Sequence, residues 1–252
     1  MKNIKIIFAV CIACIACETK QDGSGFKFVS HFTLDDISIV NDANNHSKPA
    51  SIQSFNSSPA DYTSSLDGKV GACYKLNGNC AFVCDSNLFY NFQLEYRNFN
   101  KYSVSFWFKV NDLSGTDVKY FFRSTLTYEY NCGDGRYTDN GLAIRNDTLM
   151  SVITDNQNFF RRRTYTPIPC NLFEWNQITE VVDSGEYKLY VNGVKLNYYP
   201  PKRCFDAKKS YLSDIHIGNR SGSGIYMLLD DVLVYNYPVT EAEVLKYYNS
   251  TK

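Results

Sequence analysis

A net charge and the common catalytic motifs are both missing from this sequence. Its 26 Lys and Arg residues balance its 26 Asp and Glu residues, so no electrostatic footprint for nucleic acid is present. The three histidines, His31, His46 and His216, are widely separated, whereas acid–base catalysis needs such groups beside reactive partners. No G-x-S-x-G, H-E-x-x-H or phosphate-binding glycine loop is present. These absences argue against a nucleic-acid-binding protein and against the hydrolases and nucleotide-binding proteins that carry those motifs.

A long hydrophobic run is missing as well. The apolar stretch Ile6–Ala16 follows Lys2 and Lys5 and has about eleven residues, too few to span a bilayer as a helix. Positive residues followed by a short apolar core are typical of a targeting segment, which takes no part in the fold. The alanine directly before Cys17, at the end of this core, resembles a bacterial lipobox. We therefore expect Cys17 to carry a lipid and to anchor the protein to a membrane.

Two alternatives to this anchor stay open. Cys11-Ile12-Ala13-Cys14 offers a competing frame for the same signal, and an ordinary cleaved secretion signal would leave the protein secreted. In the lipoprotein reading, residues 1–17 form a signal peptide that ends at the lipobox cysteine, and residues 18–25 form a polar tether. Residues 26–252 are then a single domain. The expected location is the cell envelope of a Gram-negative bacterium, at the outer membrane or the cell surface.

The cysteines do not have the spacing of a zinc site. Nine cysteines less the three of the leader leave six: Cys73, Cys80, Cys84, Cys132, Cys170 and Cys204. Cys80-x-x-x-Cys84 has no second short-spaced pair, so structural thiols or disulfides are favoured over zinc. Six cysteines allow fifteen pairings, which the sequence cannot distinguish. A bridge among Cys132, Cys170 and Cys204, which lie in loop-like stretches, is our preferred hypothesis.

What the sequence does have is β structure. Aromatic residues make up 15% of the chain, and twenty are tyrosines. Tyr187, Leu189 and Val191 alternate with polar residues, which is the period of a strand with one buried face. Asn192-Gly193 follows, and both residues accept the positive φ that a type I′ hairpin turn needs. The stretch Trp175–Leu196 therefore predicts two antiparallel strands with a tight turn at its end.

Further strands are indicated by the same alternation, and one helix by a capping signal. Tyr102–Val110 predicts a core strand with Val104, Phe106 and Phe108 on one face and Trp107 on the other. Thr240-Glu241-Ala242-Glu243 is a capping box that opens a helix to Tyr248. No second domain or internal repeat is visible. The other expected elements are strands at Phe26–Leu34, Val118–Thr127 and Phe159–Ile168, a hairpin from Ala72 to Cys84, and a hairpin around Asn146-Asp147.

Five segments, in order, resemble laminin-G-like members of the concanavalin A-like lectin/glucanase superfamily. They are the glycine hairpin Gly68–Gly78, the strand Tyr102–Lys109, the unit Trp175–Leu196, Ile215–Gly218 and Leu229–Asn236. The resemblance covers about Phe26 to Asn249. It implies an all-β fold, a two-sheet antiparallel jelly-roll sandwich. The capping box at Thr240 adds one short C-terminal helix. Hydrolases of this superfamily carry E-x-D-x-x-E or E-x-D-x-E on one strand, and this chain has neither, so we expect no catalytic activity.

The resemblance also implies a structural calcium ion between an early loop and the last strand. Asp230 alternates with Val232 and Val234, so we expect its carboxylate on the apolar side, where it needs a hydrogen bond or a cation. Asp35 and Asp42 would supply the other oxygen ligands, which are the kind calcium prefers. The alternative is that Asp230 accepts backbone N–H bonds and binds no metal. The early loop departs from the family pattern because Asp36 replaces a glycine.

Exposed aromatic loops are the remaining candidates for a binding site. A tyrosine ring stacks on the apolar face of a sugar and its hydroxyl forms hydrogen bonds. We therefore expect a non-catalytic, lipid-anchored envelope protein that binds carbohydrate. The alternatives are a protein–protein adhesion or assembly module of the same fold and a diverged glycan-degrading enzyme. The expected ligand-binding residues are Tyr128, Tyr130, Tyr137, Tyr198 and Tyr199.

Overall fold

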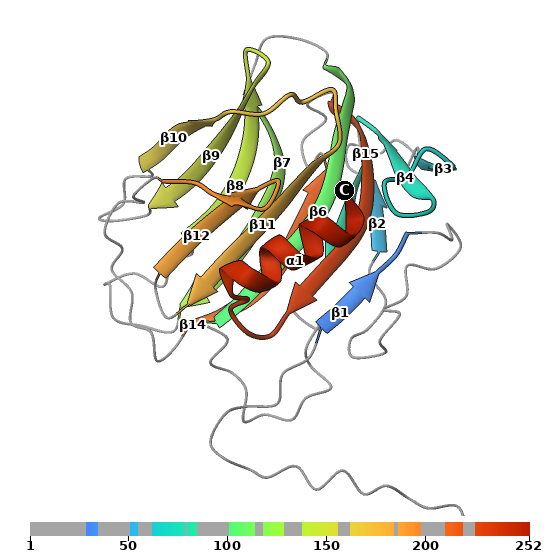
Figure 1. Cartoon of the computed structure of the whole chain (residues 1–252). Helices are drawn as coiled ribbons and strands as arrows, with labels where there is room; N and C mark the ends of the chain where they lie inside the picture. Colours follow the sequence, from blue (N-terminus) through green and yellow to red (C-terminus); the bar gives the residue numbers. More distant parts are fainter. Residues whose placement is uncertain are drawn as a thin grey trace, which may run out of the picture.

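Fifteen strands and one helix make up the described part of this computed structural model (Figure 1). The statements below concern that part of the chain. It comprises residues 29–34, 51–54, 62–78, 80–84, 101–113, 118–128, 138–155, 162–183, 186–197, 210–218 and 225–252. Within these ranges no helix is both long enough and apolar enough to cross a membrane.

Eight strands form one antiparallel sheet, which we call sheet A. Seven of them follow the order β13-β12-β11-β6-β15-β4-β3, and β1 pairs with β15 beyond the end of β4. The bounds are β1 Val29–Phe32, β3 Tyr62–Ser65, β4 Cys73–Asn77, β6 Lys101–Leu113, β11 Asn176–Asp183, β12 Glu186–Val191, β13 Val194–Lys195 and β15 Ile225–Tyr235.

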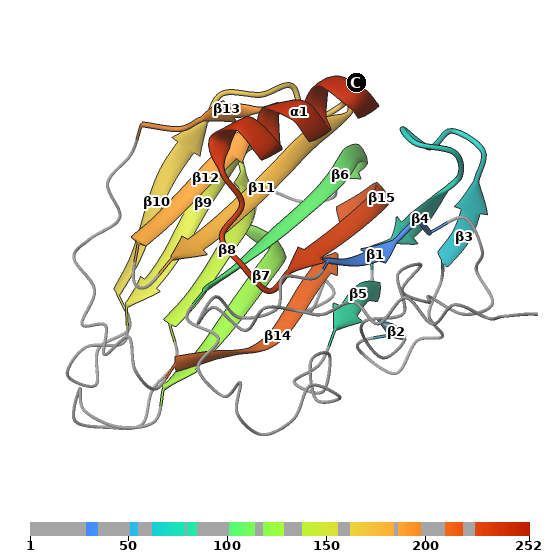
Figure 2. The same ribbon diagram turned by 60° about the horizontal axis from the view of Figure 1, so that its bottom comes forward.

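Seven strands form the second antiparallel sheet, sheet B, in the order β10-β9-β8-β7-β14-β5-β2. The two sheets pack face to face as a sandwich, as the sequence predicted (Figure 2). The bounds are β2 Ser51–Ser54, β5 Cys80–Cys84, β7 Lys119–Tyr128, β8 Thr138–Arg145, β9 Thr148–Asp155, β10 Arg162–Ile168 and β14 Ser210–Gly218.

The core lies between the sheets and follows the period of two. In β6, Val104, Phe106 and Phe108 join the core and Trp107 lies on the outer face, as predicted. Phe106 meets Phe122 of β7 with ring centroids 5.1 Å apart, which joins sheet A to sheet B. Each buried phenylalanine contributes about 2 kcal/mol relative to an exposed one. These contacts fix which side of each strand faces outward.

Two tight turns follow directly from local sequence. Asn192 and Gly193 have φ values of +52° and +76° between β12 and β13, so the predicted type I′ turn is confirmed. Asn146 and Asp147 have φ values of +49° and +56° in the β8–β9 hairpin. Both turns need the left-handed region, which asparagine, aspartate and glycine adopt more readily than other residues.

The C-terminal helix α1, Glu241–Thr251, covers part of the outer face of sheet A (Figures 1 and 2). Thr240 caps it by accepting a bond from the Glu243 N–H, and the Glu243 carboxylate accepts one from the Thr240 N–H, which confirms the predicted capping box. Val244 packs with Val181 and Tyr190 of the sheet. A local start signal and an apolar face together place this helix.

The expected hairpin from Ala72 to Cys84 is wrong. Its two strands exist, but β4 pairs with β3 and β15 in sheet A, whereas β5 pairs with β2 and β14 in sheet B. The Asn77-Gly78 turn therefore joins the two sheets, and the Gly78 N–H donates to the Ile225 carbonyl. Gly78 has a φ of +63°, the positive value that the predicted turn needs. The prediction was wrong about the pairing of the two strands that flank this turn.

The cysteines of the described ranges are not joined by disulfide bonds. Cys73, Cys80 and Cys84 are buried and Cys170 is half-buried. Burial raises the pKa of Cys170 to about 11, so the thiol stays protonated at neutral pH. The expected loop bridge therefore does not include Cys170. The other pairing of that hypothesis, Cys132 with Cys204, lies outside the described residues.

Candidate functional site

Most of the site residues expected from sequence lie outside the described ranges. The structure describes the backbone of Tyr128, which ends β7 opposite Ser210 of β14. Asp230, in β15, is described in full. The expected residues outside the described ranges are Cys17, Asp35, Asp42, Tyr130, Tyr137, Tyr198 and Tyr199.

The predicted orientation of Asp230 is wrong, although its burial is confirmed. Leu229 and Val232 both belong to the core between the sheets. Strict alternation places one residue between two core residues of a strand, whereas two, Asp230 and Asp231, lie between these. The register with β6 shifts between Asp230 and Leu233, and Asp231 has a φ of +50°. This is a β-bulge. It leaves Asp230 opposite Trp107, on the outer face of sheet A under α1.

The Asp230 carboxylate is fully buried and only partly hydrogen-bonded. Its Oδ2 accepts a bond of 2.7 Å from the Val70 N–H, whereas Oδ1 has no partner among the described residues. Burial raises the pKa of Asp230 to about 7, with a smaller contribution from the Asp231 carboxylate. A buried oxygen with unused lone pairs costs free energy unless a proton or a cation reaches it.

This geometry fits one ligand of a cation site. The described part of the chain holds no group of three or more His, Cys, Asp or Glu residues that could bind a metal. However, β1 runs antiparallel to β15 and ends with Phe32 opposite Val232. β1 therefore ends two residues from Asp230 in register, and Asp35 follows Phe32 by three residues in the sequence. Asp230 thus lies near the described end of β1.

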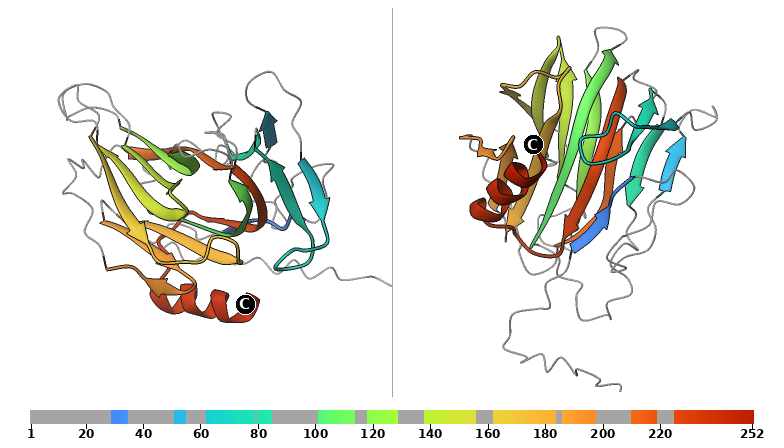
Figure 3. Two further views of the ribbon diagram at one scale, coloured as in Figure 1. Left: turned by 90° about the horizontal axis from the view of Figure 1, so that it is seen from above. Right: turned by 45° about the vertical axis from the view of Figure 1, so that its right-hand side comes forward.

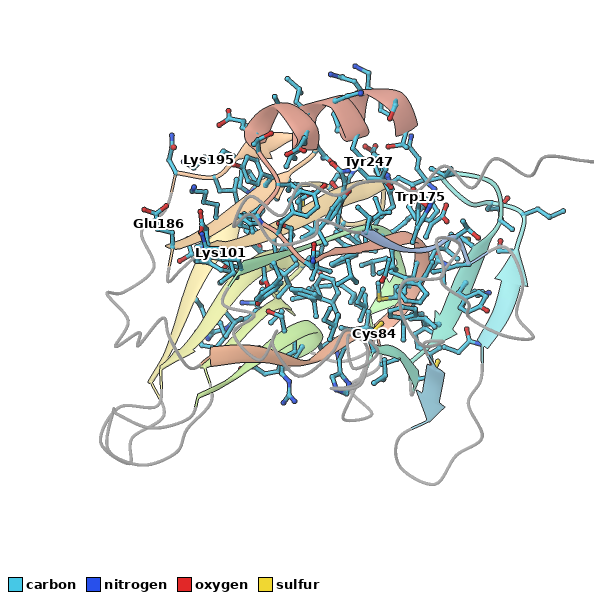
Figure 4. All side chains as sticks on the ribbon, turned by 90° about the horizontal axis from the view of Figure 1, so that it is seen from below. Cys84, Lys101, Trp175, Glu186, Lys195 and Tyr247 are labelled. Atoms are coloured by element: carbon cyan, nitrogen blue, oxygen red, sulfur yellow. The ribbon has the colours of Figure 1, made fainter. Side chains whose placement is uncertain are left out.

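Asp231 is bonded differently from its neighbour and joins both ends of the domain. Its two carboxylate oxygens bond to the His31 Nε2 of β1 and to the Tyr247 hydroxyl of α1. Tyr247 is labelled in Figure 4, where it lies beneath the helix. Burial and the nearby Asp231 charge raise the pKa of Tyr247 far above its usual range, so this hydroxyl remains a donor. The cluster fastens α1 and β1 to the bulge.

A second group of side chains lies on the outer face of sheet B. Tyr120 stands on β7 and Tyr165 on β10, with β8 and β9 between them. Their hydroxyl oxygens are 2.5 Å apart, so the two side chains meet above the intervening strands. Both are half-buried. We call this pair, with Arg123 and His216, the sheet B face.

Arg123 and His216 extend the sheet B face toward β14. They are directly opposite each other in register, and Arg123 also pairs with Gly141 of β8. A Cβ on Gly141 would come within 2.6 Å of the Phe122 carbonyl oxygen, so close approach of β7 requires glycine there. Gly141 and Ala143, the outward residues of β8 at this level, are small, and Val152 of β9 lies between Gly141 and Tyr165 in register.

The sheet B face was not predicted from sequence. The strands that carry Tyr120 and Tyr165 were expected, but nothing local separates these two tyrosines from the other eighteen. Their contact depends on strand order, because β7 and β10 are brought together by β8 and β9. Rings with polar edges, a guanidinium group and an imidazole can stack on and hydrogen-bond a hydroxyl-rich ligand.

A family model described as the concanavalin A-like lectin/glucanases superfamily (Laminin_G_3) matches residues 90–245 of this chain. No curated protein sequence matches it. The solved structures below are at most 22% identical in sequence and therefore show the fold alone.

A mutant sialidase of Trypanosoma rangeli that displays trans-sialidase activity has a TM-score of 0.62 and 13% identity. The match covers 88% of this chain and 32% of the sialidase, so the chain spans about a third of that enzyme's length. Domain 4 of a GH43 extracellular arabinanase from Geobacillus stearothermophilus, in complex with arabinotriose, has a TM-score of 0.54 and 22% identity. That match covers 86% of this chain and 96% of the domain.

The binding domain of botulinum neurotoxin DC is similar in two complexes, one with SialylT and one with rat synaptotagmin II. Each has a TM-score of 0.60 and 13% identity. The matches cover 90% of this chain and 51% or 52% of the neurotoxin domain. Structures of this fold thus include one bound to a sugar and one bound to a protein.

Proposed function

We propose that this chain, which belongs to the concanavalin A-like lectin/glucanases superfamily, binds carbohydrate without cleaving it. The observation that carries the proposal is the contact between the Tyr120 and Tyr165 hydroxyl groups across β8 and β9. Two half-buried rings that meet at their hydroxyl groups offer flat apolar surface, and the hydroxyl groups offer hydrogen bonds. The solved domain that holds arabinotriose, of the same fold, supports this assignment.

The five loop tyrosines expected from sequence belong to the same proposal. Tyr128 ends β7, and Tyr137 directly precedes β8, so both flank the connection between two strands of sheet B. We propose that these residues, with Tyr130, Tyr198 and Tyr199, extend the contact with the ligand beyond the sheet B face. The chain would be held at the cell envelope by a lipid on Cys17.

A structural calcium ion completes the proposal. Asp230 would be one ligand, through the carboxylate oxygen that has no partner among the described residues, and Asp35 and Asp42 would be others. Calcium would supply positive charge to a buried carboxylate and tie the segment after β1 to β15. The alternative, in which Asp230 accepts only backbone N–H bonds, agrees with the bond from Val70.

A glycan array followed by calorimetry tests carbohydrate binding. We expect the full-length chain, purified in mild detergent, to bind a neutral oligosaccharide. Tyr165→Ala should weaken that affinity at least tenfold, because stacking on an aromatic ring is lost, and Tyr165→Phe should weaken it less because the ring stays. Phe173→Ala, which removes an exposed aromatic ring outside the sheet B face, is the matched control. An array without any bound saccharide would contradict the proposal.

A protein ligand is the second candidate function. The neurotoxin binding domain in complex with synaptotagmin II has the same fold, so the sandwich also serves protein recognition in that molecule. A blank glycan array together with specific capture of one surface protein would favour this adhesion or assembly module. Loss of that capture in Tyr165→Ala would place the protein contact on the sheet B face.

A further inference from the structure

Two lysines flank one leucine on the outer face of sheet A. Leu228 of β15 lies directly opposite Lys75 of β4 on one side and Lys109 of β6 on the other. The neighbours of Lys75 and Lys109 in their strands, Tyr74 and Phe108 among them, belong to the core, so both lysines point outward. Lys75 is exposed and Lys109 is half-buried, whereas Leu228 is 5% exposed.

Neither Lys75 nor Lys109 has a charged partner in the described part of the chain. Within the described ranges Lys75 and Lys109 make no ion pair and no side-chain hydrogen bond. Two strand spacings separate their Cα atoms, roughly 10 Å. Like charges at this distance repel each other weakly in water, and an anion placed between them would be attracted by both.

A third ammonium group borders the same surface. Lys69, in the loop between β3 and β4, lies 5.1 Å from the centroid of the Trp107 ring. Trp107 is two residues from Lys109 and therefore on the same face. The Val70 N–H bond to Asp230 holds this loop against β15. Three cationic side chains from three different segments thus lie near one another.

An aromatic ring and one carboxylate lie at the other end of the surface. Tyr226, two residues from Leu228, is 37% exposed and pairs with Asn77 of β4 and Asp112 of β6. Asp112 is exposed, and so is Asp67 in the Lys69 loop, whereas Asp230 is buried beneath that loop. Three ammonium groups therefore face two exposed carboxylates, and the balance at the surface stays positive. The helix α1 lies across β11 and β6 and leaves the β4 end of the sheet uncovered (Figure 3).

We propose that the surface formed by Lys69, Lys75, Lys109 and Tyr226, the lysine face, binds an acidic saccharide with carboxylate groups. The ammonium groups would bind the carboxylates, and the exposed tyrosine ring would stack on a sugar ring. The lysine face is on the opposite sheet from the sheet B face, so it is a second binding site. This second proposal does not depend on whether a neutral glycan binds to Tyr120 and Tyr165.

An oligogalacturonate and a neutral oligosaccharide of equal length are the probes. We expect calorimetry on the full-length chain to show binding of the acidic probe that weakens as salt is raised, because charges are screened. Lys75→Met with Lys109→Met should weaken it at least tenfold. Methionine retains an aliphatic stem over Leu228, so the fold is kept while both charges are removed. Lys75→Arg with Lys109→Arg should retain binding.

Lys195→Met is the matched control, because Lys195 is an exposed lysine on β13 at the other edge of sheet A. An equal loss of affinity in this control would overturn the proposal, since it would show a general charge effect. Absence of oligogalacturonate binding to the wild type would also overturn it. The double methionine variant should leave any neutral glycan affinity unchanged, which separates this test from that of the sheet B face.

Vesicles that contain phosphatidylserine are the third probe. Leu66 and Val70 of the Lys69 loop are 93% and 36% exposed, and apolar side chains beside lysines also occur on membrane-binding surfaces. The proposal would be overturned if the wild type binds vesicles but not oligogalacturonate and the double methionine variant loses vesicle binding. The lysine face would then be a membrane contact. Oligogalacturonate binding lost in that variant and kept in Lys195→Met would support it.

Discussion

Trp107 of β6 and Tyr248 of α1 stack with ring centroids 5.7 Å apart and an angle of 24° between the ring planes. The Trp107 Nε1–H also donates to the Thr251 hydroxyl at 3.2 Å. Gly193, in the β12–β13 turn, also approaches this ring, since a Cβ there would lie 3.0 Å from Tyr248. The C-terminal helix is therefore held to sheet A by this aromatic stack, by the Asp231 cluster and by the packing of Val244.

Tyr248→Ala should lower the free energy of unfolding by about 2 kcal/mol, because the stack and the buried ring area are lost. Tyr248→Phe keeps the ring and should stay close to the wild type. Urea unfolding followed by fluorescence measures both. Equal losses in the two variants would show that the stack does not hold the helix.

The stability of the domain should fall between about pH 4 and about pH 7 in the presence of a chelator. The pKa of Asp230 is raised from 3.8 to about 7 in the folded state, so the folded protein binds this proton more tightly than the unfolded chain. The stabilisation is complete below about pH 4 and is lost as the pH rises through about 7. Melting temperatures of the wild type should drop over this range.

Asp230→Asn is the control for this pH dependence. Its amide oxygen can still accept the Val70 N–H bond, but it has no proton to lose. His31 and Asp231 are unchanged in the variant, so the difference between the two pH curves isolates Asp230. Two curves that fall in parallel would assign the pH dependence to other groups.

Calcium should raise the melting temperature of the wild type by several degrees over its value in chelator. A ligand at a hundred times its dissociation constant stabilises the folded state by about 2.7 kcal/mol. Asp230→Asn should abolish this rise. If calcium leaves the melting temperature of the wild type unchanged, Asp230 accepts only backbone hydrogen bonds. The stability of Asp230→Asn by itself does not distinguish a calcium ligand from an acceptor of backbone hydrogen bonds.

Labelled palmitate should be incorporated into the wild type and not into Cys17→Ser, because Ala16-Cys17 ends the apolar run of the leader. Cys14→Ser is the matched control and should retain the label. Label that follows Cys14 instead would shift the processing frame by three residues. Label that depends on neither cysteine would point to a secreted protein.

The purified chain should release no reducing ends from β-glucans, galactans or host-type glycans above a heat-denatured control. The reason is the missing pair of carboxylates at alternating positions on one strand. Colorimetric assay of reducing sugar over a range of pH measures this. One reproducible turnover on any of these substrates would contradict the prediction and favour the diverged glycanase.

Sequence alone determined those features whose physical cause is local. Asn192-Gly193 set a type I′ turn because both residues tolerate positive φ, and Thr240 with Glu243 set the start of α1 because they bond to each other's backbone. The period of two placed Phe106 and Phe108 in the core for the same kind of reason. The family resemblance added the two-sheet arrangement.

Tertiary structure decided the rest, because pairing between strands depends on residues far apart in the chain. Asn77-Gly78 reads as a hairpin turn, yet the strands on its two sides belong to different sheets, and only the competition for partners settles that. One bulged residue after Asp230 reversed the face on which its carboxylate lies. The sheet B face and the lysine face both arise where strand order brings distant side chains together.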